Sequence, residues 1–430
     1  MATWEEDLWT SSIESGMPRR DRRSGGYLRY VPDSLMAGPL WLPPDVDQLV
    51  ARAEQAVQDL AGNANDLAGI ARFLLRSEAI ASSRIEGIAP AVNQVALAEL
   101  GTHEATPDVS AQARLVANNM TVVHDARTVL VAAPAVTVSH LVDLHKALLP
   151  DEPHHHGIRT VQNWIGGSDH HPIDADFVPP APERVPALLD DLIAYLNGAG
   201  HSPVVQAGLG HAQFETIHPF TDGNGRVGRA MIHTILTRRQ LTTSAVLPVS
   251  LVLSTLRSEY VAGLTAYRHA EPIGSTGYHA ARAGWLRVFA TAVITASGQA
   301  GRLAADLAEL RAEWDERLAR TRAKQGKVRG VRSDSATALI VRDLPATPVL
   351  TSATVQRIHQ VSHVAAGRAL DELVAAKILQ THVRRGQRYY QANDVLDLIT
   401  TTERRLASTK FDTRTSPPMR PVPARPAALT

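Results

Sequence analysis

The stretch HPFTDGNGRVGR, from His218 to Arg229, decides the fold that we predict for this chain. It joins two segments with a helical hydrophobic pattern, and its middle holds Gly223 and Gly225 on either side of Asn224. Glycine allows positive φ angles and lets a backbone approach a ligand closely. Successive N–H groups in such a turn, opening into a helix N-terminus, form a site for an anion. We therefore expect a phosphate-type group to bind at this turn.

Charged and titratable side chains surround the turn. Arg226 and Arg229 lie at the start of the second helix with a spacing that puts them on one face, and arginine suits bidentate contact with phosphate. Asp222 offers a carboxylate beside the turn, where Mg²⁺ could bridge phosphate oxygens. Histidine titrates near neutral pH, so His218 can take a proton from an attacking hydroxyl. The set predicts phosphoryl or nucleotidyl transfer.

The same stretch resembles the signature of the Fic family, H-x-F-x-[DE]-G-N-G-R-x-x-R, at every fixed position. These positions are His218, Phe220, Asp222, Gly223, Asn224, Gly225, Arg226 and Arg229. Most characterised members with this motif are protein adenylyltransferases. The resemblance implies that AMP is transferred from ATP to a Ser, Thr or Tyr hydroxyl of a target protein or of the chain itself. It implies ATP and Mg²⁺ as the substrate and the metal.

Individual roles are also implied by the resemblance. His218 is the expected base, and Asp222 is the expected Mg²⁺ ligand. The backbone from Gly223 to Gly225 is expected to cradle the phosphates, with Asn224 helping. Arg226 and Arg229 are expected to bind the β- and γ-phosphates, and Phe220 is expected to anchor the loop in the core.

A second segment extends the resemblance. TVQNWIGG, residues 160–167, is predicted to be a strand ending in a turn, and FVPPAP, residues 177–182, has too much proline for a regular element. Together they look like the Fic flap, a hairpin that covers the active site. A target protein would dock on residues 160–177 by adding an extended segment to the edge of the hairpin. Because such pairing uses backbone groups, it does not identify the target.

The segment SSRIEG, at the end of a predicted N-terminal helix, resembles the Fic inhibitory motif [ST]-x-x-x-E-[GN]. Ser82, Glu86 and Gly87 satisfy it, and Gly87 with Pro90 is expected to end the helix. Its place ahead of the motif resembles the class with an N-terminal inhibitor inside the same chain. The resemblance implies that Glu86 pairs with Arg229, so that ATP binds only in an unproductive pose.

The predicted fold is mainly α: a helical Fic core with a β-hairpin flap, and a C-terminal winged-helix domain. We expect an N-terminal helical region with the inhibitory helix (1–105), a catalytic core (106–295), a helix and basic linker (296–335), a winged-helix-like domain (336–400) and a disordered tail (401–430). In the fourth segment two helical patterns precede ILQTHVRRGQRYYQAN, which alternates like a hairpin turning at Gly386.

Whether the winged helix binds DNA stays open. Arg384, Arg385 and Arg388 on the hairpin suit phosphate, whereas Asp371 and Glu372 on the second helix would repel it. A protein-interaction or dimerisation role for the same fold also stays open. Two further alternatives are a de-AMPylase that uses the same site and a DNA-binding regulator in which nucleotide occupancy only signals.

Composition narrows the remaining classes. The chain has no cysteine, which excludes disulfides and thiolate metal sites, and its formal net charge of +1 gives no bulk attraction to nucleic acid. No signal peptide or membrane span is recognised, so we expect a soluble, cytoplasmic protein. The histidine runs at 154–156 and 170–171 lack the helical spacing of a typical zinc site and are interpreted as solvated loop residues.

Overall fold

The computed structural model describes residues 1–12, 15–62, 67, 69–101, 104, 109–198, 200–242, 245–327 and 330–407. They form a mainly helical structure with small sheets, which confirms the predicted fold class. The chain divides into two compact units that alternate along the sequence. Unit 1 comprises Met1–Gln58, Thr121–Thr243 and Leu256–Ile294, and unit 2 comprises Asp59–Met120, Ser244–Thr255 and Thr295–Thr430. The five segments suggested by the sequence stay a prediction.

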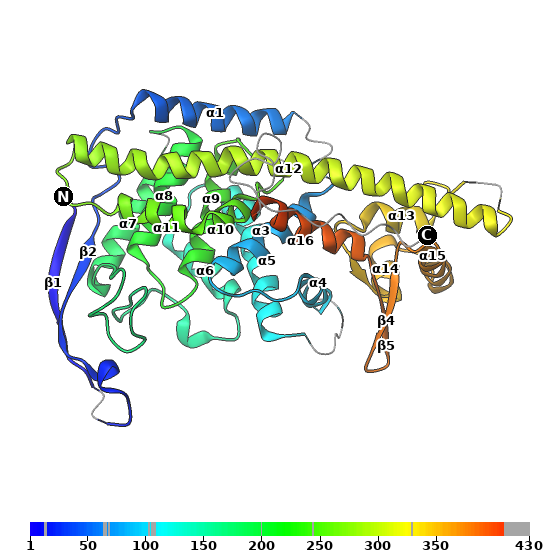
Figure 1. The fold of residues 1–430 in the computed structure, drawn as a ribbon, viewed down its shortest axis with the longest axis horizontal. Helices are drawn as coiled ribbons and strands as arrows, with labels where there is room; N and C mark the ends of the chain where they lie inside the picture. Colours follow the sequence, from blue (N-terminus) through cyan, green and yellow to red (C-terminus); the bar gives the residue numbers. More distant parts are fainter. Residues whose placement is uncertain are drawn as a thin grey trace. The chain divides into compact units, whose positions relative to one another are not determined.

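Unit 1 begins with an antiparallel hairpin of β1 (Thr3–Trp9) and β2 (Gly25–Val31), drawn in dark blue in Figure 1. Two partly buried acids join the strands, since Arg29 pairs with both Glu5 (3.1 Å) and Asp7 (2.7 Å). The sequence analysis does not predict this hairpin. The short 3-10 helix η1 (Arg19–Arg22) lies between its strands.

The helices of unit 1 surround a buried pair. They are α1 (Pro44–Ala61), α6 (Val138–Leu148), α7 (Val185–Asn197), α8 (Pro203–Ile217), α9 (Asn224–Arg238) and α11 (Arg257–Tyr267), with the 3-10 turns η2 (Pro153–His155) and η3 (Pro182–Arg184). Every residue of α8 from Val204 to Ile217 is buried. A Cβ on Gly228 of α9 would lie 2.7 Å from Glu215 Oε1 and 2.9 Å from Phe214 Cδ1, so only glycine lets α9 pack this closely on α8.

Unit 2 contains seven helices among its described residues, and α5 and α12 contribute residues to both units. The helices are α3 (Ala71–Ile85), α4 (Val92–Gly101), α10 (Val249–Thr255), α13 (Ala336–Asp343), α14 (Ser352–His359), α15 (His363–Ala375) and α16 (Asn393–Ala407); the shared ones are α5 (Ala111–Ala132) and α12 (Thr276–Lys324). One apolar core joins Phe73 of α3, Trp314 of α12 and Leu370 of α15. The N-terminal helix of the sequence analysis therefore folds with C-terminal elements.

The C-terminal part of unit 2 has the helices and the hairpin that the sequence predicts. Strands β3 (Val349–Leu350), β4 (Gln380–Arg384) and β5 (Gln387–Gln391) form an antiparallel sheet in the order β3-β5-β4. Strand β3 lies between α13 and α14 along the chain, whereas the hairpin of β4 and β5 follows α15 and projects beside these helices (Figure 1). The winged-helix interpretation stays a prediction. Helix α16 continues to Ala407, so residues 401–407 do not belong to the expected tail; residues 408–430 lie outside the described residues.

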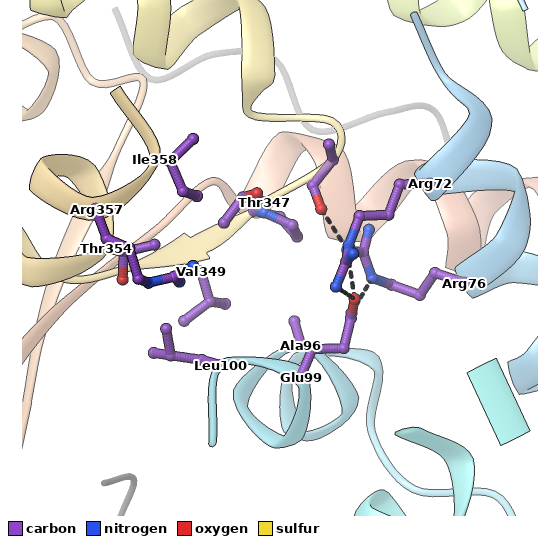
Figure 2. A pocket seen from close by; sticks show the side chains of 12 residues that line it. Arg72, Arg76, Ala96, Glu99, Leu100, Thr347, Val349, Thr354, Arg357 and Ile358 are labelled. Carbon is purple, nitrogen blue, oxygen red and sulfur yellow. Dashed lines mark hydrogen bonds and ion pairs between the residues drawn. The ribbon is translucent and has the colours of Figure 1, made fainter. Parts of the chain in front are cut away.

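Helix α3 is anchored along its length within unit 2. The buried Arg76 makes two bonds to Glu99 of α4, at 2.5 and 3.2 Å, and donates to the carbonyls of Pro345 and Ala346 at 3.2 and 2.7 Å. Figure 2 shows the bonds between Arg76 and Glu99 at one wall of a cavity of about 120 Å³. Glu78 accepts from both the backbone and the hydroxyl of Ser250 in α10. These contacts hold the first half of α3 against three other segments.

None of the described helices combines the length and the apolar character that a bilayer-spanning segment requires.

Candidate active site

The loop between α8 and α9 has left-handed backbone at both of its ends. His218 caps α8 with φ 51° and ψ 60°, and Gly223 precedes α9 with φ 77°. For a residue with a side chain this conformation is uncommon and strained. A Cβ on Gly223 would also lie 2.7 Å from Leu148 Cδ2, so glycine is required there twice over. The left-handed backbone of His218 and Gly223 thus holds residues 218–223 in one conformation.

The interior of the loop is closed by Asn224. Its side-chain oxygen accepts from the Phe220 backbone N–H at 2.8 Å, and its side-chain nitrogen donates to the Phe220 carbonyl at 2.8 Å. Asn163 donates to the same carbonyl at 2.9 Å. Asn224 is buried, and the Phe220 ring is fully buried as expected. The side chain of Asn224 therefore holds the turn through both of its polar atoms, and its expected help in cradling phosphate stays a prediction.

Arg159 braces the loop from the segment before the flap, and the sequence analysis misses it. The guanidinium is buried and donates to the carbonyls of His218 (2.8 Å), Val161 (3.1 Å) and Pro180 (2.5 Å), while the Arg159 backbone donates to Pro219 (2.9 Å). Burial lowers the pKa of Arg159 to about 10, so the side chain stays charged at neutral pH. Arg159 therefore positions the backbone that carries the His218 imidazole.

His145 of α6 supports the other half of the loop and is also missed from the sequence. Its Nε2 lies 3.0 Å from the Asp222 carbonyl, and its ring stacks on Phe220 with centroids 4.0 Å apart. Burial lowers the pKa of His145 to about 4, so at neutral pH the ring is neutral and Nε2 carries the hydrogen that it donates. The Asp222 backbone is thereby fixed while its carboxylate remains outside.

The charged residues of the predicted site meet where α9 begins. Asp222 has a side chain that is 53% exposed, and it pairs with Arg226 at 3.2 Å. Arg226 and Arg229 are both buried. Burial and then the Arg229 cation lower the pKa of His211 in α8 to about 3. An exposed carboxylate, two buried guanidinium groups and a helix N-terminus thus lie within the first turns of α9, as an anion site requires.

The flap differs from the predicted strand. Residues 160–167 form no ladder in the described structure; Ile165 and Phe177 make one isolated antiparallel bridge, and Ser168 and His171 make another. Gly166 and Gly167, with φ angles of 76° and 72°, form the turn that was expected at the end of the segment. His171, interpreted as solvated, is buried and bonds the Arg20 carbonyl at 2.7 Å. The flap is therefore a braced loop rather than a regular hairpin.

The inhibitory segment ends its helix as predicted. Helix α3 stops at Ile85, Glu86 is its exposed C-cap residue, and Gly87 follows with φ 79°. Ser82 is buried, whereas Glu86 is exposed to solvent. Within the motif, Arg84 pairs with Glu403 of α16 at 2.6 Å. The expected pair of Glu86 and Arg229 joins residues of different units and stays a prediction.

The same part of the chain resembles known proteins in its sequence. The Fic/DOC family model matches residues 135–236, which include the loop, α6 and the flap. A protein adenylyltransferase of Caenorhabditis briggsae, fic-1, is 33% identical over 134 residues, which are 30% of this chain and 24% of that protein. A probable protein adenylyltransferase of Aquifex aeolicus is 42% identical over 72 residues, or 16% of this chain and 22% of that protein.

The chain thus spans about a quarter of the length of the curated relatives that it matches. A solved Fic family protein from Desulfovibrio desulfuricans G20 is 21% identical with a TM-score of 0.49, and the match covers 82% of this chain and 97% of that one. The family match rests on the sequence of the segment that holds His218 and its braces. Residues 135–236 of the chain thus match the Fic/DOC family model, and this part of the chain is similar to protein adenylyltransferases.

Proposed function

We propose that this chain is a protein adenylyltransferase, which moves AMP from ATP to a hydroxyl of a target protein or of itself. The observation that carries the proposal is the braced loop 218–223, which presents His218 beside the N-terminus of α9 and its two buried arginines. The relatives named protein adenylyltransferases support the same reaction.

The reaction needs a base, an electrophile and a stabilised leaving group. His218 takes the proton of the attacking hydroxyl, whose oxygen forms a bond to the α-phosphorus of ATP. The bond from that phosphorus to the oxygen that bridges to the β-phosphate breaks, and pyrophosphate leaves. Backbone N–H groups at Gly223 to Gly225 and the guanidinium groups of Arg226 and Arg229 stabilise the phosphate charge.

The donor set also fits Mg²⁺. Asp222 offers an exposed carboxylate beside the phosphate-binding turn, and Mg²⁺ is usually held by few carboxylates together with phosphate oxygens. Mg²⁺ would supply charge neutralisation between the phosphates, and Asp222 is the residue that would hold it. Arg226 pairs with the same carboxylate at 3.2 Å, so Mg²⁺ would compete with this ion pair.

We further propose that Glu86 restrains the site. Removing its carboxylate in Glu86→Gly is expected to increase labelling from ATP carrying the label at the α-phosphate by about tenfold to a hundredfold, because a charge-assisted bond to arginine is lost. Intact-mass analysis then detects the gain of AMP on the chain itself. Glu86→Gln is the matched variant, since it removes the charge and keeps the size. Equal labelling of wild type and Glu86→Gly contradicts the restraint, and no AMP on any variant or target contradicts the reaction.

Arg159→Lys tests the brace on the catalytic loop. Lysine keeps the charge but presents a single ammonium group, so it cannot serve carbonyls on several sides. We expect the transfer rate to fall by about a hundredfold, the cost of a small misplacement of reacting groups, with little change in KM for ATP. The control is Arg184→Lys, whose side chain is 58% exposed. A wild-type rate in Arg159→Lys would show that the brace does not position His218.

A further inference from the structure

The turn after α6 gathers three side chains that can bind a metal ion. Glu152 precedes the 3-10 turn η2, which contains His154 and His155. One ligand atom from each residue lies within 4.8 Å of the other two, and the rings of His154 and His155 have centroids 4.1 Å apart. These histidines are interpreted as separate solvated residues from the sequence alone. The turn instead points them toward one carboxylate.

The orientation of His155 is fixed by the catalytic loop. Its Nδ1 lies 2.8 Å from Thr221 Oγ1, and its Nε2 lies 3.6 Å from Glu152 Oε2. When Nδ1 donates to Thr221, Nε2 presents its lone pair on the side of Glu152, as a metal-binding ring nitrogen does. Histidines that bind metals usually hold their second ring nitrogen in such a bond.

We propose that Glu152, His154 and His155 bind a divalent transition metal ion of the zinc class, with water completing its coordination. Two imidazoles and a carboxylate suit Zn²⁺ and Co²⁺, whereas Mg²⁺ and Ca²⁺ prefer oxygen ligands alone. The partly exposed turn leaves room for the water ligand.

A metal ion here would link the turn to the catalytic loop. Thr221 immediately precedes Asp222, so the chain from the metal through His155 to Thr221 ends beside the proposed Mg²⁺ ligand. The ion would hold the turn after α6 against that loop. This inference does not rest on the proposed transfer reaction, because binding is measured without ATP or turnover.

The experiment titrates the full chain, free of any purification tag and stripped with chelator, with Zn²⁺ against a chromophoric competitor. Cobalt is then used as a probe, because its visible absorption reports nitrogen ligands and coordination geometry. We expect wild type to bind a zinc ion that His154→Ala/His155→Ala and Glu152→Ala lose. Thr221→Val is expected to weaken binding by about ten- to hundredfold, as loss of the bond that orients a metal-bound histidine does.

Two controls give the test its specificity. His363→Ala removes an exposed histidine of α15 and should leave zinc affinity unchanged. Asp222→Ala should also leave it unchanged, and loss of the ion in that variant would assign it to the nucleotide site and overturn the proposal. Equal zinc affinity in wild type and the double histidine variant would overturn it too. Absence of zinc binding in wild type would overturn the proposal as well.

Discussion

His218→Ala is expected to lower AMP transfer by about a hundredfold to ten-thousandfold, the contribution typical of a positioned general base. ATP binding should persist, because Arg226, Arg229 and the turn at Gly223 do not depend on the imidazole. The measurement pairs single-turnover transfer from labelled ATP with equilibrium ATP binding, both in the Glu86→Gly background. Transfer at the rate of the parent protein would remove His218 from the role of base.

A second substitution separates chemistry from backbone strain. His218 has φ 51°, a conformation that asparagine tolerates better than alanine does. His218→Asn should therefore keep the loop shape and the ATP affinity while losing transfer as fully as His218→Ala. If His218→Asn alone retained transfer, the defect of His218→Ala would be conformational.

Arg76→Ala is expected to destabilise unit 2 by about 3–5 kcal/mol, the usual cost of removing one partner of a buried ion pair. Glu99, whose side chain is 9% exposed, would keep its charge without its main partner, and the carbonyls of Pro345 and Ala346 would lose their donor. Urea unfolding followed by circular dichroism measures the loss as a lower midpoint.

Arg72→Ala is the matched control for that variant. Arg72 pairs with the same carboxylate at 3.1 Å, yet its side chain is 50% exposed, so its contribution should stay below about 1 kcal/mol. The two arginines are visible together at Glu99 in Figure 2. Equal losses in the two variants would show that burial does not decide the strength of this pair.

Local chemistry made part of this structure predictable. The glycines that end α3 and open α9 are conformational signals that act within a few residues, and the helical patterns of α8, α14 and α15 are equally local. The loop 218–229 was identifiable because base, acid, glycines and arginines fall within one short stretch. Each of these features depends on neighbours along the chain.

The braces of the loop could not be found in the same way. Arg159 and His145 bind backbone carbonyls of His218 and Asp222, which any residue type would offer, so no pairing of side chains marks them in the sequence. His145 also occupies an ordinary amphipathic helix. The N-terminal hairpin was not predicted because Glu5, Glu6 and Asp7 stand in a row where a core strand would have apolar residues. The flap strand was wrong, since its residues make only the isolated bridge of Ile165 with Phe177.

The contacts that anchor α3 limit how Glu86 can move. The helix that carries Glu86 is bonded to the Pro345–Ala346 segment through Arg76, to α10 through Glu78 and to α16 through Arg84. A helix that detached freely from the rest of unit 2 would not make these bonds. A change in the position of Glu86 would therefore require either that these C-terminal elements move with α3 or that these polar bonds break.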